Sequence, residues 1–288
     1  MVCPVAKPAG AAQPEQQLDQ KTPSSAQQNG RAAGNGARQK KEPATKEPHV
    51  PDTPRCAVGM LDVKGHHRGE VINAFGATTV NSVSKTLTLP INSRAYLGTR
   101  CSAGAEHDPT AYSTLTNILG GSLSYTTDVS GCGCRCIGTF YLASMHQNKL
   151  PSGMGDYYCD SAGIGGVHCP EVDFQEANRH AWHSVVHTSH DPDGKDGGYG
   201  GGEWSWSGPR DWTKEKYGPG SACVDTTKPF RVKASFPVDP ATSELDHMLV
   251  ELSQNGCSIT TRKVGKGGGR HSYTDEKMKE ISAALRTG

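Results

Sequence analysis

The stretch CPEVDFQEAN, residues 169–178, carries three carboxylates, at Glu171, Asp173 and Glu176. Side chains of a β-strand alternate between two faces, so Glu171 and Asp173 share a face while Glu176 points to the other. One β-bulge would shift Glu176 by one position and bring all three acids to the same side. A helix cannot do this as well, because a separation of five residues turns the side chain off the face shared by i and i+4. The stretch is therefore either a bulged strand that presents three acids to one cleft or an ordinary acidic surface segment.

The composition favours a β-rich chain without a strong net charge. The 288 residues include 35 glycines and 18 prolines, which favours short strands and many turns. The formal net charge of +1 gives no basis for a nucleic-acid partner or an anionic membrane partner. We also find no apolar run long enough for a membrane span, which needs about 18 residues or more. The length suits one large domain with extensions.

Ten cysteines indicate an oxidising compartment or metal binding. The cluster CGCRC, residues 132–136, is the best zinc candidate. No second Cys/His pair at zinc-ribbon spacing accompanies it, so we expect no metal site. The N-terminal sequence lacks the apolar core of a signal peptide. Cysteine usage thus indicates an extracellular protein, while the N-terminus gives no route for export.

The chain divides near residue 55. Between Pro8 and Pro54 the only large apolar side chains are Leu18 and Val50, so residues 1–55 are expected to form a disordered tail. From Cys56 onward, alternating or β-rich segments bounded by turn residues predict strands, at residues 85–91, 122–129, 138–145 and 228–236.

One helix is expected, near the C-terminus. Thr274 suits the N-cap, Gly288 suits the end, and Met278, Ile281 and Leu285 fall at helical spacing between them. The pattern as a whole predicts an all-β fold, with antiparallel sheets in two layers and one terminal helix.

Several stretches, in the same order along the chain, resemble the glycoside hydrolase family 7 cellulases. None is decisive alone, but their order and the spacing of the acids argue against chance. The stretches are SRAYL (93–97), NILGGSLSYTTDVSGCGC (117–134), GTFYLASM (138–145), YYCDS (157–161), CPEVDFQEAN (169–178), YGPG (217–220), DTTKPF (225–230) and LSQNG (252–256).

The resemblance implies a concanavalin-like β-jelly-roll sandwich of two antiparallel sheets over residues 56–288, with the acids on a bulged strand. The family motif is Glu-x-Asp-x-x-Glu-Ala-Asn. It implies that Glu171 is the nucleophile, that Asp173 hydrogen-bonds and tunes it, and that Glu176 is the general acid/base. A retaining glycosidase needs two such carboxyls about 5 to 5.5 Å apart. Crowding three acids raises the proton affinity of at least one of them, which supplies the protonated donor.

The resemblance extends to two basic side chains. His187 follows Glu176 by the distance at which the family places a histidine near the acid/base and the sugar; a coincidental surface histidine is the alternative. Arg210, shortly before YGPG, corresponds to an arginine that binds sugar on the leaving-group side, and a solvated surface arginine is the alternative. Both side chains would donate hydrogen bonds to sugar hydroxyls.

Tryptophans near the acids are candidates for sugar stacking, because the C–H face of a pyranose is apolar. Trp182, Trp204 and Trp206 are assigned to substrate binding, and Trp204 and Trp206 would share one strand face. Burial in the core is the alternative for each of them.

Cysteines add a check on the resemblance. It implies a disulfide between Cys159 and Cys169, which ties YCDS to the catalytic strand. The family's second, parallel bridge lacks both partners here, at Gly163 and His168. Cys223 with Cys257 is a plausible further bridge between neighbouring strands.

The likeness covers roughly residues 70–285, and it departs from the family in three places. GGGEWSWSGP (200–209) replaces a cysteine-bearing segment, and the family's strands before residue 70 and after residue 288 have no counterpart. The chain is thus either a compact, divergent member or an incomplete gene model. Its shortened loops favour an open cleft and internal cleavage.

The expected function is that of an extracellular, monomeric, retaining endo-β-1,4-glucanase acting on cellulose or a related β-glucan, without metal or other cofactor. A non-catalytic carbohydrate-binding or cell-wall protein on the same fold is the competing hypothesis. A laminarinase-type hydrolase with a similar acid triplet is a third.

Overall fold

The structure, a computed structural model, describes residues 56–65, 67–101, 107–152, 155–164, 166–190, 210–263 and 273–288. The expected disordered tail lies outside these residues. The elements are β1 (Cys56–Val63), β2 (His67–Phe75), β3 (Thr79–Asn81), β4 (Thr86–Thr88), β5 (Arg94–Gly98), β6 (Ser122–Thr127), β7 (Gly138–Ala143), β8 (Glu171–Ala177), β9 (Trp182–His187), β10 (Tyr217–Gly218), β11 (Val224–Asp225), β12 (Phe230–Ser235), β13 (Met248–Gln254), β14 (Cys257–Lys263) and α1 (Asp275–Thr287), with short 3-10 helices at Pro109–Ala111 and Met145–Gln147.

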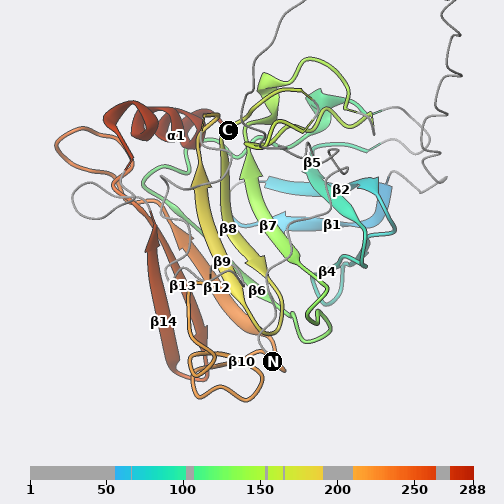
Figure 1. Cartoon of the computed structure of the whole chain (residues 1–288). Helices are drawn as coiled ribbons and strands as arrows, with labels where there is room; N and C mark the ends of the chain where they lie inside the picture. Colours follow the sequence, from blue (N-terminus) through green and yellow to red (C-terminus); the bar gives the residue numbers. More distant parts are fainter. Residues whose placement is uncertain are drawn as a thin grey trace, which may run out of the picture.

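Two antiparallel sheets form a sandwich. One has the order β7-β8-β9 and the other the order β14-β13-β12-β6, and Figure 1 shows them packed across one another. Side chains from both sheets meet in one hydrophobic core, for example Phe174 and Val186 from the first and Val232 and Leu252 from the second. The burial of this apolar surface is the main stabilising term of such a fold. The expected all-β sandwich is therefore confirmed.

Smaller sheets accompany the sandwich. The β1-β2-β5 sheet lies beside β7 in Figure 1, β3 and β4 form a hairpin, and β10 pairs with β11 in parallel. The predicted segment 85–91 contains β4, and the segments 122–129, 138–145 and 228–236 contain β6, β7 and β12.

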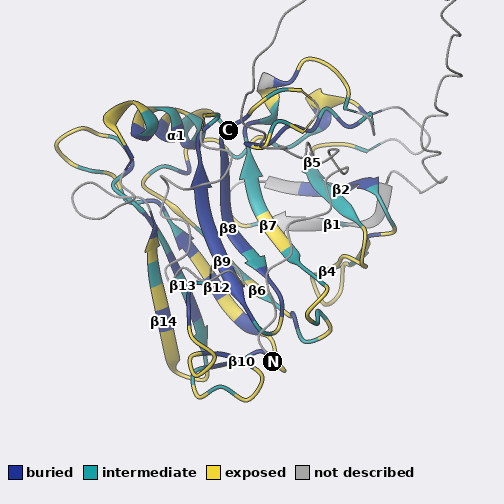
Figure 2. Cartoon of the chain, in the orientation of Figure 1, coloured by how far each residue is buried: buried dark blue, intermediate teal, exposed yellow. Residues whose placement is uncertain are grey.

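Strands β8 and β9 differ in burial from the rest of the sandwich. In β12 buried and exposed residues alternate, as expected when one face meets the core and the other meets water. Nearly every residue of β8 and all of β9 are buried, which gives the dark central pair of strands in Figure 2. The acidic stretch is therefore not an ordinary surface segment.

Helix α1 forms as predicted and closes one end of the sandwich (Figure 1). The Thr274 hydroxyl caps it by accepting a hydrogen bond from the Lys277 N–H at 3.4 Å, and Met278, Ile281 and Leu285 are buried. Within the part of the chain that the structure describes, no helix has the length and apolar character needed to cross a membrane.

The cysteine pairing confirms the two predicted disulfides, Cys159–Cys169 and Cys223–Cys257. Cys132 and Cys136 are joined to each other, so these sulfurs are not available as the thiolate ligands that zinc requires. Among the described residues, disulfides join Cys132 to Cys136, Cys159 to Cys169 and Cys223 to Cys257.

Candidate active site

The predicted bulge is present in β8. Asp173 lies opposite Val185 of β9, whereas Glu176 lies opposite His183, so three steps along β8 match two along β9. The extra residue returns Glu176 to the face that carries Glu171 and Asp173. The opposite face supplies the core residues Val172, Phe174 and Ala177, whose spacing changes from two to three at the same place.

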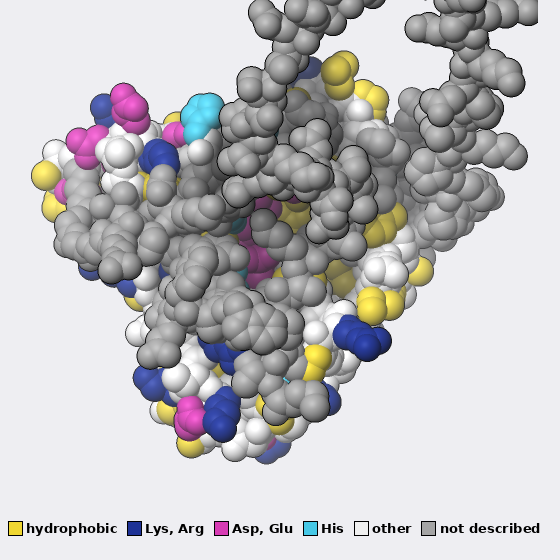
Figure 3. Space-filling model, viewed as in Figure 1, with side chains coloured by type: hydrophobic (Ala, Val, Ile, Leu, Met, Phe, Trp, Pro, Cys, Tyr) yellow, Lys and Arg dark blue, Asp and Glu magenta, His cyan; other side chains and the backbone are white. Residues whose placement is uncertain are grey.

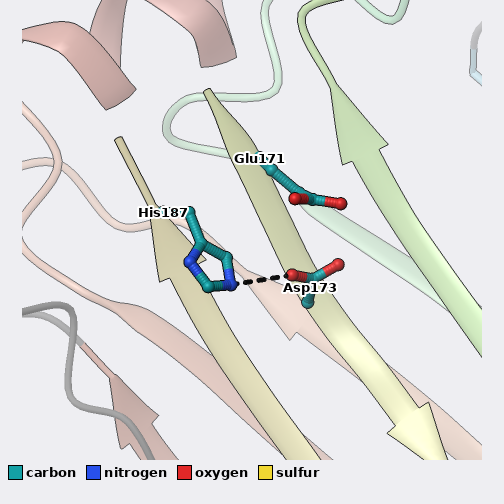
Figure 4. Close-up of side chains that lie close together, drawn as sticks. All are labelled: Glu171, Asp173 and His187. Carbon is teal, nitrogen blue, oxygen red and sulfur yellow. Dashed lines mark ion pairs between the residues drawn. The ribbon is translucent and has the colours of Figure 1, made fainter. Parts of the chain in front are cut away.

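Two of the acids and a histidine form a compact cluster. Glu171 and Asp173 come from β8 and His187 from β9, and all three point to the same space in Figure 4. One polar atom from each lies within 4.8 Å of the others. The Nε2 atom of His187 lies 3.2 Å from Oδ2 of Asp173. The Glu171 residue is 9% exposed and the Asp173 residue 5%, so neither charge is solvated as a surface carboxylate would be.

This cluster is a set of side chains linked by hydrogen bonds. Three side chains at this spacing could in principle surround a cation. The His187 nitrogen, however, is already at hydrogen-bond distance from Asp173, and Ser161 donates to Glu171. These side chains are therefore held by contacts within the protein itself.

Ser161 fixes the Glu171 carboxyl. Its backbone N–H and its hydroxyl both donate to Oε2 of Glu171, at 3.2 Å and 3.1 Å. Ser161 is held in turn by the Cys159–Cys169 disulfide and by the Cys169 N–H, which donates to the Asp160 carbonyl at 2.9 Å. The disulfide therefore ties YCDS to the start of β8, close to Glu171.

Burial and mutual repulsion change the protonation of the acids. Burial raises the pKa of Glu171 well above its ordinary value, the Asp173 charge raises it further, and His187 opposes the shift. Burial likewise raises the pKa of Asp173, with Glu176 and Asp160 adding repulsion. Carboxyls crowded in this way cannot all ionise together, so the cluster retains a proton at a pH where isolated acids have lost theirs.

Glu176 is the most open of the three acids, with 19% of its side chain exposed. Its Oε2 atom lies 2.8 Å from Nδ1 of His183, a residue that is only 2% exposed. We expected His187 beside the acid/base, but His187 contacts Asp173 and His183 occupies the place beside Glu176. The bulged register is the reason, because it sets Glu176 opposite His183. The even spacing of His183 and His187 on one strand was the signal that could have identified this residue.

Tyrosines that were not singled out from the sequence lie behind the acids. Tyr141 on β7 lies opposite Asp173, and its hydroxyl is 3.3 Å from that of Tyr158, which donates to Asp160 at 3.1 Å. Burial raises the pKa of Tyr141 to about 12, so this phenol keeps its proton. Arg94 of the SRAYL stretch stacks over the Tyr158 ring, 3.7 Å from its centroid, which connects β5 to the site.

Trp182 is a core residue, and its assignment to substrate binding is wrong. The residue is 1% exposed, and its ring centroid lies 5.9 Å from those of Tyr217 and Phe230 and 6.3 Å from that of Trp212. An indole enclosed by aromatic side chains has no free face for a pyranose ring.

The remaining candidates are placed only in part. Arg210 is described and half-buried, and its contact with a sugar stays a prediction. Trp204 and Trp206 lie outside the described residues. Figure 3 shows acidic side chains gathered at the centre of the face viewed in Figure 1, with hydrophobic side chains near them.

The fold and the site together show a β-sandwich protein that carries a buried acid cluster on a bulged strand. No protein-family model matches the chain, and no curated protein matches it. Three solved structures to which it is similar are glycoside hydrolases. A family 7 cellobiohydrolase from Daphnia pulex is 18% identical with a TM-score of 0.45; the match covers 76% of this chain and 63% of that one.

The other two are from Humicola insolens. Glycosynthase mutants are 17% identical with a TM-score of 0.46, covering 80% of this chain and 77% of theirs. The native endocellulase EGI is 19% identical with a TM-score of 0.41, and the match covers 73% of this chain and 60% of that one. The chain thus spans less than two thirds of the Daphnia pulex protein and of the native endocellulase.

Proposed function

We propose that this protein is a retaining glycoside hydrolase that cleaves β-1,4 bonds in cellulose or a related β-glucan. The observation that carries the proposal is the bulge in β8, which sets Glu171, Asp173 and Glu176 on one face. The resemblance of the surrounding sequence stretches to family 7 cellulases supplies the substrate class. The disulfides are consistent with an extracellular location.

In this proposal the Glu171 carboxylate attacks the anomeric carbon as the glycosidic C–O bond breaks. Glu176 gives its proton to the departing oxygen, and it later removes a proton from the water that breaks the covalent glycosyl–enzyme bond. Each cycle therefore returns both carboxyls to their starting state. The side chains of this chain suffice for both steps.

The attacking carboxyl must be ionised although burial opposes ionisation. The two hydrogen bonds from Ser161 stabilise the charged form of Glu171. We therefore assign the retained proton of the Glu171–Asp173 pair to Asp173, whose protonated carboxyl can donate a hydrogen bond to His187 Nε2. Asp173 then acts as a neutral hydrogen-bonding neighbour of the nucleophile.

The experiment is reducing-end release from carboxymethyl cellulose, mixed-linkage β-glucan and laminarin by the wild type and by Glu171→Gln and Glu176→Gln. The rate of reducing-end release should fall about 100-fold or more in each variant, which is the scale of the loss when an acid/base or a nucleophile is removed. Glu251→Gln, on β13 of the other sheet, is the charge-matched control and should retain activity. A chelator should not change the rate.

The alternative of a non-catalytic carbohydrate-binding protein gives a different result. A folded wild type that binds these polymers but releases no reducing ends would contradict the enzyme and support that alternative. Cleavage of laminarin alone would keep the mechanism and change the substrate. Release of internal fragments from the soluble polymers would support endo-action by a monomer in an open cleft.

A further inference from the structure

We propose that His183 is a positioning residue that holds the Glu176 carboxyl in the orientation needed for proton transfer to the leaving oxygen. The inference rests on the proposed function and extends it to a residue outside the acid motif. Its basis is the 2.8 Å contact between His183 Nδ1 and Glu176 Oε2, formed by residues that face one another across β8 and β9.

The two partners differ in exposure. The His183 residue is 2% exposed, whereas 19% of the Glu176 side chain is exposed. A glutamate that reaches solvent can sample several rotamers, and fixing it in one costs about 1.5–2 kcal/mol of conformational entropy. A buried imidazole that already has one orientation can lower the number of rotamers that Glu176 samples.

The strand that carries His183 is anchored on its other face. The neighbouring Trp182 packs in the aromatic core, and the Ser184 hydroxyl donates to the buried Asp211 carboxyl. Asp211 is in turn paired with Lys263 at 2.6 Å. Because side chains alternate along a strand, these core contacts fix the direction in which His183 points toward Glu176.

The contact engages one of the two carboxyl oxygens of Glu176. His183 holds Oε2, so Oε1 is the oxygen that we assign to the proton transfer. A general acid must lie within about 2.6–3.2 Å of the atom that it protonates. A displacement of about 1 Å from a productive geometry costs on the order of 100-fold in rate. Holding Glu176 therefore affects the steps in which Glu176 transfers a proton, and kcat/KM reports the first of them, in which it acts as the acid.

His187 does not share this role. It contacts Asp173 at 3.2 Å, so β9 supplies one histidine to each end of the acid set. The Val185 side chain, fully buried, separates the two on the same strand. Substitution of His183 should consequently impair the acid without impairing the nucleophile.

The experiment uses the leaving-group dependence of kcat/KM, which reports bond cleavage. The dinitrophenolate of 2,4-dinitrophenyl β-cellobioside is a good leaving group and departs without protonation. The phenolate of phenyl β-cellobioside is a poorer leaving group, so its departure needs a proton from an acid. The His183→Ala variant should lose about 100-fold in kcat/KM on the phenyl substrate and change by less than about threefold on the dinitrophenyl substrate. His183→Asn, which places an N–H group near the position of Nδ1, should recover part of the loss.

Two reference variants complete the set. Glu176→Gln should show the same selective loss on the phenyl substrate. His247→Gln removes another histidine whose Nδ1 atom contacts a carboxylate, 2.7 Å from Asp246, and should leave both rates unchanged. Urea unfolding of each variant checks that its fold is intact.

Equal losses on the two substrates for His183→Ala would overturn the inference, since a general loss of structure impairs both. Unchanged rates on both would overturn it as well. Wild-type protein that cleaves neither glycoside nor any polymer would overturn the proposed function and this inference with it. An active wild type with an unselective His183→Ala leaves the proposed function standing.

Discussion

Replacing Glu171 by Gln should stabilise the fold near neutral pH while it removes the proposed activity. The polar atoms of Glu171 and Asp173 lie within 4.8 Å of one another in a buried site. If both carboxyls were ionised, their charges would repel by about 3.5 kcal/mol at an effective dielectric constant of about 20, and this energy is why the pair retains one proton, assigned above to Asp173. Protonation and His187 relieve part of this energy, so we expect the variant to gain about 1–3 kcal/mol in the free energy of unfolding. The amide keeps an oxygen that can accept from Ser161.

The sign of the pH dependence follows from the raised pKa values of the Glu171 and Asp173 carboxyls. The folded state holds the proton that this pair retains more tightly than the unfolded chain, whose aspartates and glutamates titrate near pH 3.9 and 4.3. The stabilising contribution of that proton is therefore complete below about pH 4 and is lost as pH rises from there through the raised pKa of the folded state. The difference between the variant and the wild type should be small near pH 4 and largest at neutral pH.

Urea unfolding with the disulfides intact, followed by tryptophan fluorescence at acidic and neutral pH, measures this difference. Glu251→Gln serves as the control and should change the free energy of unfolding by about 0.5 kcal/mol or less at either pH. A Glu171→Gln variant less stable than the wild type at neutral pH would refute the electrostatic reasoning. A difference of equal size at both pH values would refute it too.

Three further changes test the packing around the site, each by equilibrium unfolding. Lys263→Met leaves the Asp211 carboxyl buried without its cation and should cost about 3–5 kcal/mol; a neutral effect would contradict the importance of the pair. Changing both Cys159 and Cys169 to Ser releases a loop with a sequence separation of 10 and should cost about 2–3 kcal/mol, so unchanged stability would show that other contacts hold YCDS in place. Trp182→Ala should cost about 3–5 kcal/mol because it empties an aromatic core position, and a cost below about 1 kcal/mol would contradict its assignment to the core.

Local patterns predicted the features that depend on neighbouring residues. The alternation rule applied to Glu171, Asp173 and Glu176 required a bulge, and the register of β8 contains it. Helix α1 follows from Thr274 and the spacing of its buried side chains. The disulfide between Cys159 and Cys169 came from the resemblance rather than from a local rule.

The features that were missed depend on contacts between distant strands. Trp182 and Trp212 are separated by 30 positions, and only the folded sandwich brings them together in one core. A periodic pattern identifies a strand face without saying which face meets the core. The partner of Glu176 was missed for the same reason, because the choice between His183 and His187 depends on the pairing of β8 with β9.

The central claim is that Glu171 forms a covalent bond with the sugar, and trapping of that intermediate tests it most directly. The protein would be incubated with 2,4-dinitrophenyl 2-deoxy-2-fluoro-β-cellobioside, which forms the glycosyl–enzyme readily and hydrolyses from it slowly. Mass spectrometry of the intact protein and of its peptides would then locate the label. The account predicts one fluorocellobiosyl group per chain, on the peptide that contains Glu171, and none in Glu171→Gln. An active wild type that acquires no label, or a label on Glu176, would contradict it.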